Sequence, residues 1–398
     1  MKPSANFLIQ RLPGFCLFIF VAAATIGVFT GGIWATLGLG GAIVMFAAIW
    51  RIEGRAPLPT SEVLIFVLSA LWVFAILNFQ SSQTSLSWAM WEQLATIFLP
   101  LCVYANASIQ KRAASPRLFK VLPVAAAIGA LALGVELSLH GPLLKLVRGP
   151  AAGLFQYNRG FSYLVVLGFP IMAGLWVTKR RWLILLFILI LLLPASLTES
   201  RAAKLAVVLG LLTALAAHLL PLMTRRSLMA LSIVAIGWPF AVQQLFLHHH
   251  KWIESLPSSW QDRMELWDYM SYRILERPIF GWGLGSSPTL PLAEPHGSLY
   301  RYELVSAPHP HNAIIQLWVE LGLPGLAFGL IFAFFMLNRA GRLPHSLMPF
   351  AMGAWMAAFC LAMISYNFWT DSLWSALALT AFAFALLQRQ KKEPGKGS

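Results

Sequence analysis

The chain has 398 residues, of which 58% are hydrophobic and only 11% are charged, and its mean hydropathy is +0.70. This composition excludes an ordinary soluble domain and indicates a polytopic helical membrane protein. The net charge of +14 would suit a nucleic-acid partner. The positions of the basic residues explain that charge better as a signal of membrane topology, so we expect no nucleic-acid partner.

Apolar segments long enough to cross a bilayer, at roughly 17 to 25 residues each, recur along the whole chain. They lie at residues 15–31, 34–50, 63–79, 87–105, 118–139, 160–178, 182–197, 202–222, 227–247, 313–337, 346–365 and 369–388. We therefore predict an all-α transmembrane bundle of about twelve spans. No low-complexity linker or internal repeat is evident, so we treat residues 1–398 as a single membrane domain.

The basic residues alternate between the two sides of this bundle. Alternate loops, counted from the N-terminus, hold 19 of the 29 Lys and Arg residues and only Glu53, Glu62 and Glu393 among the acidic ones. That side carries about +16 (19 − 3), whereas the other side holds 10 basic and 12 acidic residues, about −2. The positive-inside rule then predicts that both termini lie in the cytoplasm.

The longest polar interval, residues 248–312, lies on the non-cytoplasmic side in this topology and holds six of the nine histidines. We expect one large loop here. Within it, residues 260–270 place tryptophans and methionines at three- and four-residue steps, which predicts an amphipathic helix lying in the membrane interface. The glycines and proline of residues 278–285 are expected to end that helical region.

Charged residues at the non-cytoplasmic ends of the spans form the first group of candidates. They are Glu92, Glu136, Glu199, Arg201, Lys204, Glu320 and Asp371. Such residues normally face a wet cavity or one another. Interfacial snorkelling and structural pairing would explain any one of them equally well.

Arg201 and Lys204 are the most specific of this group. Ser200 suits the N-cap of a helix that begins at Arg201, and two cations three residues apart project from one face of its first turn. Free backbone N–H groups and the positive helix end add to these cations, which predicts a site for phosphate or pyrophosphate. Either cation could instead pair with Glu199.

Arg159 occupies the same kind of position at the outer start of another span. A lipid-headgroup anchor is the alternative role, and the nearby Lys145 and Arg148 suit that role better. Arg263 and Arg273, on or beside the amphipathic segment, could reach over the same cavity or lie in the interface.

His309 and His311 are the candidate catalytic residues. An imidazole can take a proton from a sugar hydroxyl near neutral pH, and Pro308 and Pro310 restrict the backbone on either side. The spacing would also suit zinc, but no cysteine and no obvious third ligand accompany the pair. We therefore expect no metal site.

Five stretches together resemble the O-antigen ligase and polymerase superfamily. They are Arg201 at the head of a span, residues 263–267 (Arg-Met-Glu-Leu-Trp), residues 278–283 (Pro-Ile-Phe-Gly-Trp-Gly), residues 309–312 (His-Pro-His-Asn) and residues 316–325. The similarity covers roughly residues 150 to 340 in motif and the whole chain in span pattern.

The resemblance implies a GT-C-type glycosyltransferase of the bacterial inner membrane, metal-independent and without a cofactor. It would act in the periplasm on a glycan linked to undecaprenyl pyrophosphate, with lipid A core or another glycan as acceptor. Arg201 and Arg263 would hold the pyrophosphate with help from Arg159, and His311, favoured over His309, would act as the base. Lys204, Arg273 and Glu320 remain further candidates for substrate contact.

Two alternatives stay open at this point. A polymerase of the same superfamily, for O-antigen or exopolysaccharide, would share these motifs. A lipid-glycan flippase is less favoured, because transporters place binding groups near the midplane on broken helices in repeated halves, whereas the charges here gather at one rim.

Overall fold

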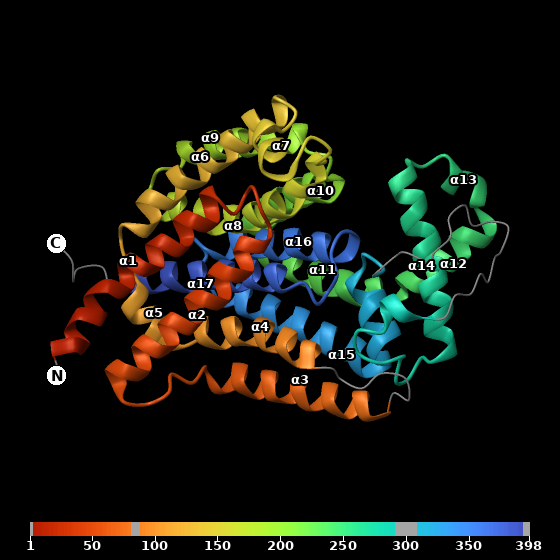
Figure 1. Cartoon of the computed structure of the whole chain (residues 1–398), viewed down its shortest axis with the longest axis horizontal. Helices are drawn as coiled ribbons and strands as arrows, with labels where there is room; N and C mark the ends of the chain where they lie inside the picture. The colour runs from red at the N-terminus through yellow and green to blue at the C-terminus, as the bar shows by residue number, and fades with distance from the viewer. Residues whose placement is uncertain (1–2, 81–87, 291–308, 393–398) are drawn as a thin grey trace.

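The computed structural model describes residues 3–80, 88–290 and 309–392, and all regular structure within these ranges is helical (Figure 1). The α-helices are α1 (Pro3–Thr25), α2 (Gly32–Glu53), α3 (Ser61–Gln80), α4 (Trp88–Tyr104), α5 (Ala107–Ala113), α6 (Leu118–Ser138), α7 (Pro142–Arg148), α8 (Asn158–Val177), α9 (Trp182–Leu197), α10 (Arg201–Leu219), α11 (Pro221–Val234), α12 (Trp238–His248), α13 (His250–Glu254), α14 (Ser258–Glu276), α15 (Ala313–Gly341), α16 (Met348–Ile364) and α17 (Asp371–Lys392). The 3-10 turns are η1 (Leu154–Tyr157), η2 (Ala235–Gly237) and η3 (Ser287–Thr289).

The all-α class and the multi-pass character predicted from the sequence are confirmed. Among the described residues, eight helical segments are long and apolar enough to cross a membrane. Four shorter apolar helices, Ser61–Trp72, Glu92–Tyr104, Trp182–Leu197 and Met348–Ile364, fall where the other predicted spans lie. Three short helices, α5, α7 and α13, were not predicted, because none is long enough to give a clear periodic pattern.

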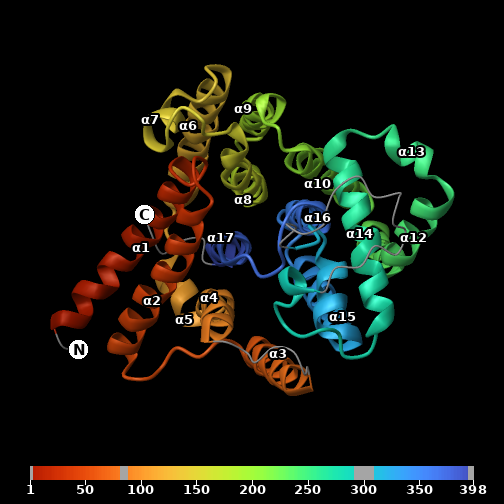
Figure 2. The ribbon, with the colours of Figure 1, turned by 45° about the vertical axis from the view of Figure 1, so that its right-hand side comes forward.

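The bundle is built around α16 and α17 (Figures 1 and 2). Helix α17 packs against α2, α4 and α8, and α16 packs against α8, α10 and α15. Helices α12, α13 and α14 lie together at the right of Figure 1, whereas α1 begins and α17 ends toward the left. Helices α12 to α14 therefore mark one end of the bundle, and the start of α1 and the end of α17 mark the other.

Small residues allow the central helices to approach closely. A Cβ on Gly210 of α10 would lie 3.0 Å from the Gly353 carbonyl oxygen of α16 and 2.4 Å from the Phe169 ring of α8. Close backbone contact of this kind is typical of membrane helices, where lipid tails leave little hydrophobic drive for association. The close contact at Gly210 and Gly353 sets the position of α10 along the axis of α16.

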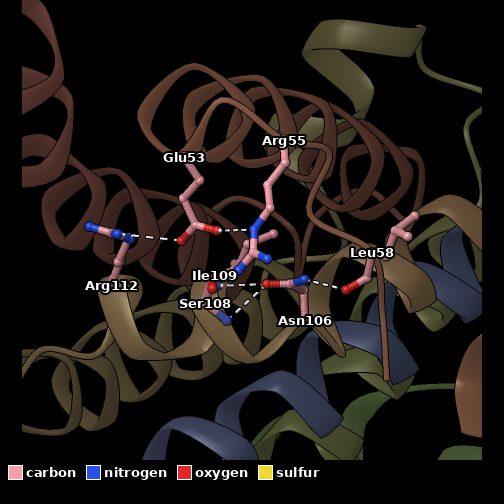
Figure 3. A network of polar contacts seen from close by, with 7 residues as sticks. All are labelled: Glu53, Arg55, Leu58, Asn106, Ser108, Ile109 and Arg112. Atoms are coloured by element: carbon pink, nitrogen blue, oxygen red, sulfur yellow. Dashed lines mark hydrogen bonds and ion pairs between the residues drawn. The ribbon is translucent and has the colours of Figure 1, made fainter. Parts of the chain in front are cut away.

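The loops predicted to be cytoplasmic meet at one end of the bundle. Glu53 accepts contacts from Arg112 at 3.4 Å and Arg55 at 3.7 Å, as Figure 3 shows. In the same network, Asn106 caps α5 and donates to the Leu58 carbonyl (Figure 3). We call this the basic-loop end, and its positive charges are partly balanced by carboxylates.

A second ion pair belongs to the basic-loop end. Arg339, near the end of α15, lies 3.2 Å from Glu62, near the start of α3. Two of the three acidic residues assigned to this side of the membrane are therefore paired with arginines of the same side. The pairing agrees with the predicted grouping of these loops.

Helix α15 is broken near its start by a turn that packs against it. Gly322 has φ of 66°, in the left-handed region that favours glycine. A Cβ at Gly322 would lie 2.1 Å from the Ile279 carbonyl oxygen, and one at Gly281 would lie 2.6 Å from the Glu320 carbonyl oxygen. The Trp282 and Gly283 N–H groups bond the carbonyls exposed by the break, at 2.8 Å each. The two glycine-containing motifs thus form one packed unit.

The predicted amphipathic helix is confirmed as α14. Its Met264, Trp267 and Met270 side chains are buried against α12 and α15 in a core of their own. The helix ends at Glu276, just before the predicted stop at Pro278. Residues 291–308, including His296, lie outside the described residues, so the predicted loop 248–312 is described only on either side of them.

Candidate functional site

The carboxyl end of α16 organises the candidate site. The last carbonyl groups of a helix have no partner within the helix, and they form its negative end. Here Arg263 Nε of α14 donates to the Ile364 carbonyl at 3.1 Å, and His311 Nδ1 lies 2.9 Å from the Ser365 carbonyl oxygen. Consecutive carbonyls therefore hold a guanidinium and an imidazole side by side.

His311 is held in one tautomer. A carbonyl oxygen can only accept a hydrogen bond, so Nδ1 must carry the proton and Nε2 is left as the basic nitrogen. Burial lowers the pKa of His311; the Ser365 bond opposes this, and the charges of Arg263 and Arg159 lower it further. The ring is therefore neutral near pH 7 and can accept a proton at Nε2.

The backbone around His311 is equally constrained. His311 has φ of 54°, a left-handed conformation that costs energy in a non-glycine residue. Trp267 Nε1 donates to the Pro310 carbonyl at 2.6 Å, and Asn312 caps α15 by accepting from the Ile315 N–H at 3.0 Å. The residue is thus fixed from both sides, which preorganises its ring.

The His309 ring lies beside that of His311, with ring centroids 4.2 Å apart and the ring planes tilted by 51°. Burial lowers the pKa of His309 to about 3, and the charges of His311 and Arg159 add to this effect. An imidazole with so low a pKa is a weak base. The Ser365 contact and the lower pKa of His309 therefore favour His311 as the proton acceptor, with His309 as its neighbour.

Arg201 begins α10, and the predicted N-cap is confirmed: Ser200 Oγ accepts from the Ala203 N–H at 3.2 Å. The next residue, Ala202, lies beside the last turn of α16, where its carbonyl oxygen is 4.0 Å from the Cys360 thiol. Burial lowers the pKa of Arg263, Asp262 opposes this, and the Arg201 charge lowers it further. The Arg201 charge is therefore close enough to act on the Arg263 guanidinium.

Lys204 is bonded to the end of α9 and not to the described residues around the end of α16. Its Nζ donates to the Ser196 carbonyl at the end of α9, at 3.3 Å. The Arg201 guanidinium is exposed and has no hydrogen bond or ion pair within the described residues. Of the two cations, Arg201 is the one free to bind an anion.

Arg159 approaches from α8 on the other side of α16. Its side chain is exposed, and its charge lowers the pKa of both histidines. It also offsets part of the rise that burial causes in the pKa of Tyr366, just past the end of α16. The structure thus brings together side chains from four segments, and we call this region the histidine end: Arg159, Arg201, Arg263, His309 and His311.

Glu320, which was predicted as a candidate for substrate contact, lies inside the protein. Its side chain is fully buried. The carboxylate accepts from four protein groups: Gly285 N–H at 2.9 Å, Ser287 Oγ at 2.5 Å, Gln316 Nε2 at 3.0 Å and Trp369 Nε1 at 2.6 Å. Since its acceptor sites are occupied by protein donors, we interpret Glu320 as a residue that ties three segments together and not as a substrate contact.

Arg273 also lies inside the protein. It is buried, and its Nη1 pairs with Glu276 Oε2 at 2.6 Å. Its guanidinium carbon lies 5.5 Å from the centre of the Trp282 ring. These contacts place Arg273 in the packing between α14 and the turn after it, and its contact with a substrate stays a prediction.

Several residues of the histidine end were missed by sequence reasoning. Ser365 and Ile364 act through backbone carbonyls, which no side-chain pattern can signal. Trp267 was recognised only as part of an apolar stripe, although its indole also holds the Pro310 carbonyl. The available signal for Ser365 and Ile364 is their position, because residues 364–368 end a predicted span on the side predicted to be non-cytoplasmic.

No metal centre is evident around the histidines. In residues 3–80, 88–290 and 309–392, no group of three or more His, Cys, Asp or Glu side chains is arranged to hold a metal ion. All three cysteines are free.

The fold defines a multi-pass helical membrane protein, with cations and imidazoles gathered at one end. Residues 186–330 match the sequence model of the family described as O-antigen ligase. This stretch contains Arg201, Arg263, His309 and His311 but begins after Arg159.

Relatives in Rickettsia agree with this match. The chain is 26% identical over 280 residues to a candidate polysaccharide ligase of Rickettsia conorii, covering 69% of this chain and 67% of the relative. Identity to a similarly named protein of Rickettsia typhi is 26% over 242 residues, covering 59% of each chain. A third, from Rickettsia bellii, is 25% identical over 270 residues, covering 65% of this chain and 66% of the relative. Together the matches confirm the resemblance to the O-antigen ligase superfamily.

Proposed function

We propose that this protein is an O-antigen ligase-like glycosyltransferase. It transfers a glycan from undecaprenyl pyrophosphate to a hydroxyl group of an acceptor, lipid A core, at the periplasmic face of the inner membrane. The family match and the relatives described as polysaccharide ligases support a ligase or transferase activity. The positive-inside distribution supports cytoplasmic termini and a periplasmic site.

The observation that carries this proposal is the arrangement at the end of α16. Arg201 is exposed and electrostatically coupled to Arg263, which is bonded to Ile364. His311, bonded to the adjacent carbonyl, keeps Nε2 free for a proton. Cations for a leaving group and a base for a nucleophile therefore stand at one site.

The chemistry follows from these roles. His311 Nε2 takes the proton from the acceptor hydroxyl as its oxygen attacks the anomeric carbon of the donor. The bond between that carbon and the pyrophosphate oxygen breaks, and the lipid pyrophosphate leaves with the electron pair. Arg201 and Arg263 stabilise the negative charge that develops on the leaving oxygen, with Arg159 adding to the positive field. A single in-line displacement of this kind inverts the anomeric centre, and no step calls for a metal.

The relatives' description favours a ligase over a polymerase of the same superfamily. Lipopolysaccharide from a deletion strain separates the two. Loss of a ligase leaves polymer on its lipid carrier and none on lipid A core, whereas loss of a polymerase leaves a single repeat unit attached.

Arg201→Gln tests the proposed chemistry. Removing one preorganised charge donor should lower transfer in detergent by about 10²- to 10³-fold. Arg112→Gln, which removes an arginine paired with Glu53 at the basic-loop end, is the matched control and should transfer normally. Near-normal transfer by a folded Arg201→Gln variant would contradict the proposal.

A further inference from the structure

A cavity of about 630 Å³ lies between the α1–α2 turn, α7 and the start of α8. We call it the α7 cavity. Its lining includes Thr30, Gln156, Tyr157 and two arginines, Arg148 and Arg159, and none of the described residues that line it is acidic. The volume falls within the range of about 300 to 1,000 Å³ typical of small-ligand sites. Two cations without a lining carboxylate suit an anionic ligand.

The walls of the α7 cavity are held firmly. Glu136, from α6, is the nearby carboxylate, and its oxygens accept from Leu143 N–H at 3.2 Å, Leu144 N–H at 2.9 Å and Tyr157 OH at 2.7 Å. These bonds anchor the start of α7 to Glu136 and use both oxygens of its carboxylate. The start of α7 is therefore fixed in place, and both Glu136 oxygens are bonded to protein donors instead of to the two arginines.

Close packing also fixes Arg159 at the edge of the α7 cavity. A Cβ on Gly160 would lie 2.3 Å from the Gly27 carbonyl oxygen, and one on Gly31 would lie 2.7 Å from Arg159 Cβ. Glycine at both positions lets the start of α8 rest on the α1–α2 turn. One turn along α8, the Tyr163 ring lies 5.6 Å from the ring of Tyr366, which follows the Ser365 that bonds His311. The start of α8, and with it the cavity, therefore adjoins the histidine end.

The outer side of the α7 cavity is apolar and exposed. Val147 and Phe155 line it and are 73% and 61% exposed, and Leu146 beside them is 81% exposed. Large exposed apolar groups next to arginines match an amphiphile, whose acyl chains cover the apolar side while its charged head enters the cavity.

We propose that the α7 cavity binds the phosphorylated head of the acceptor glycolipid, with Arg148 and Arg159 contacting its phosphate groups. This inference rests on the proposed function. Glycosyl transfer between two lipid-anchored substrates needs a place for each. Arg201 and Arg263 serve the donor pyrophosphate, and the α7 cavity, on the other side of Arg159, serves the acceptor beside His311.

Binding by the full-length protein in phosphatidylcholine nanodiscs tests the proposal without relying on catalysis. The probe is purified lipid A core carrying its phosphates. Arg148→Gln should weaken binding about tenfold, which corresponds to about 1.4 kcal/mol for one lost charge-assisted contact. Lys145→Gln is the matched control, because Lys145 is an exposed cation on the same helix that does not line the cavity, and it should bind like the unmodified protein.

The source of the phosphate is tested in the same format. Dephosphorylated lipid A core should bind equally weakly to the unmodified protein and to Arg148→Gln. Phosphatidylglycerol added to the nanodiscs should compete poorly. Equal binding of phosphorylated lipid by both proteins, or full competition by phosphatidylglycerol, would overturn the proposal and leave Arg148 as a general headgroup anchor.

Transfer kinetics separate this inference from the proposed function. Arg148→Gln should raise the KM for the acceptor about tenfold and leave the KM for the donor unchanged. If the unmodified protein transfers glycan but Arg148→Gln has a normal acceptor KM, the α7 cavity assignment fails alone. If the unmodified protein binds lipid A core through Arg148 but transfers nothing, the proposed function fails alone.

Discussion

Arg201 at the histidine end is partnered differently from the arginines of the basic-loop end, although the Arg273–Glu276 pair on α14 shows that ion pairs occur on both sides. At the basic-loop end, Arg112 and Arg339 pair with Glu53 and Glu62. At the histidine end, the buried carboxylate of Glu320 is satisfied by neutral donors, and Arg201 has no carboxylate partner within the described chain. Paired charges hold loops together, whereas cations kept apart from carboxylates remain free for an anionic ligand. The difference indicates which end binds and reacts.

The largest expected effect separates the two histidines. His311→Gln should lower kcat by about 10²- to 10⁴-fold, the usual contribution of a positioned general base. His309→Gln should cost much less, since its lower pKa makes it the poorer base. Single-turnover transfer in detergent measures both variants. If His309→Gln proves the more damaging of the two, the Ser365 contact does not mark the base.

A smaller effect is expected on thermal stability, when one carboxylate at the histidine end and one at the basic-loop end are replaced. Glu320→Gln leaves some of its four buried donors without an acceptor, at about 1 to 3 kcal/mol for each unsatisfied group. Glu62→Gln removes a partly exposed ion pair worth about 0 to 1 kcal/mol. Thermal unfolding of the purified variants should therefore show a clear fall in Tm for Glu320→Gln only. Equal falls would mean that the two ends do not differ in the way described.

The smallest effect is a shift of the pH profile. His311 must be neutral to accept a proton, so activity falls as pH drops through its pKa. Because burial and the charges of Arg263 and Arg159 lower that pKa, the acidic limb of kcat/KM should lie below pH 6.5. Arg263→Gln removes a positive neighbour, so its limb should move upward, toward 6.5.

Arg112→Gln, at the other end, should leave the limb in place and serves as the control. A limb above pH 6.5 in the unmodified protein, or a downward shift in Arg263→Gln, would contradict the assignment of His311 as the base.

The sequence predicts the helices of this fold better than the contacts between them. Span positions follow from the length and hydropathy of each segment, and the Ser200 cap and helix α14 follow from local patterns. The meeting of Arg263 and His311 at neighbouring carbonyls depends on how α14 and α15 pack against α16. Packing of this kind carries no local signature.

Two of the predicted site residues have surroundings that the sequence did not indicate. Glu320 and Arg273 stand near span ends and look free in the sequence, yet both are buried by the turn that packs against the break at Gly322. A charge near a helix end is open to substrate only if no other segment covers it. The glycines that permit this cover are visible in the sequence, but their close contact is not.

The most direct test is a structure of the full chain bound to a lipid pyrophosphate. The proposed chemistry predicts phosphate oxygens within hydrogen-bond distance of Arg201 and Arg263, with His311 Nε2 facing the same space. A pyrophosphate that contacts neither arginine, or that binds at the basic-loop end, would contradict the central claim.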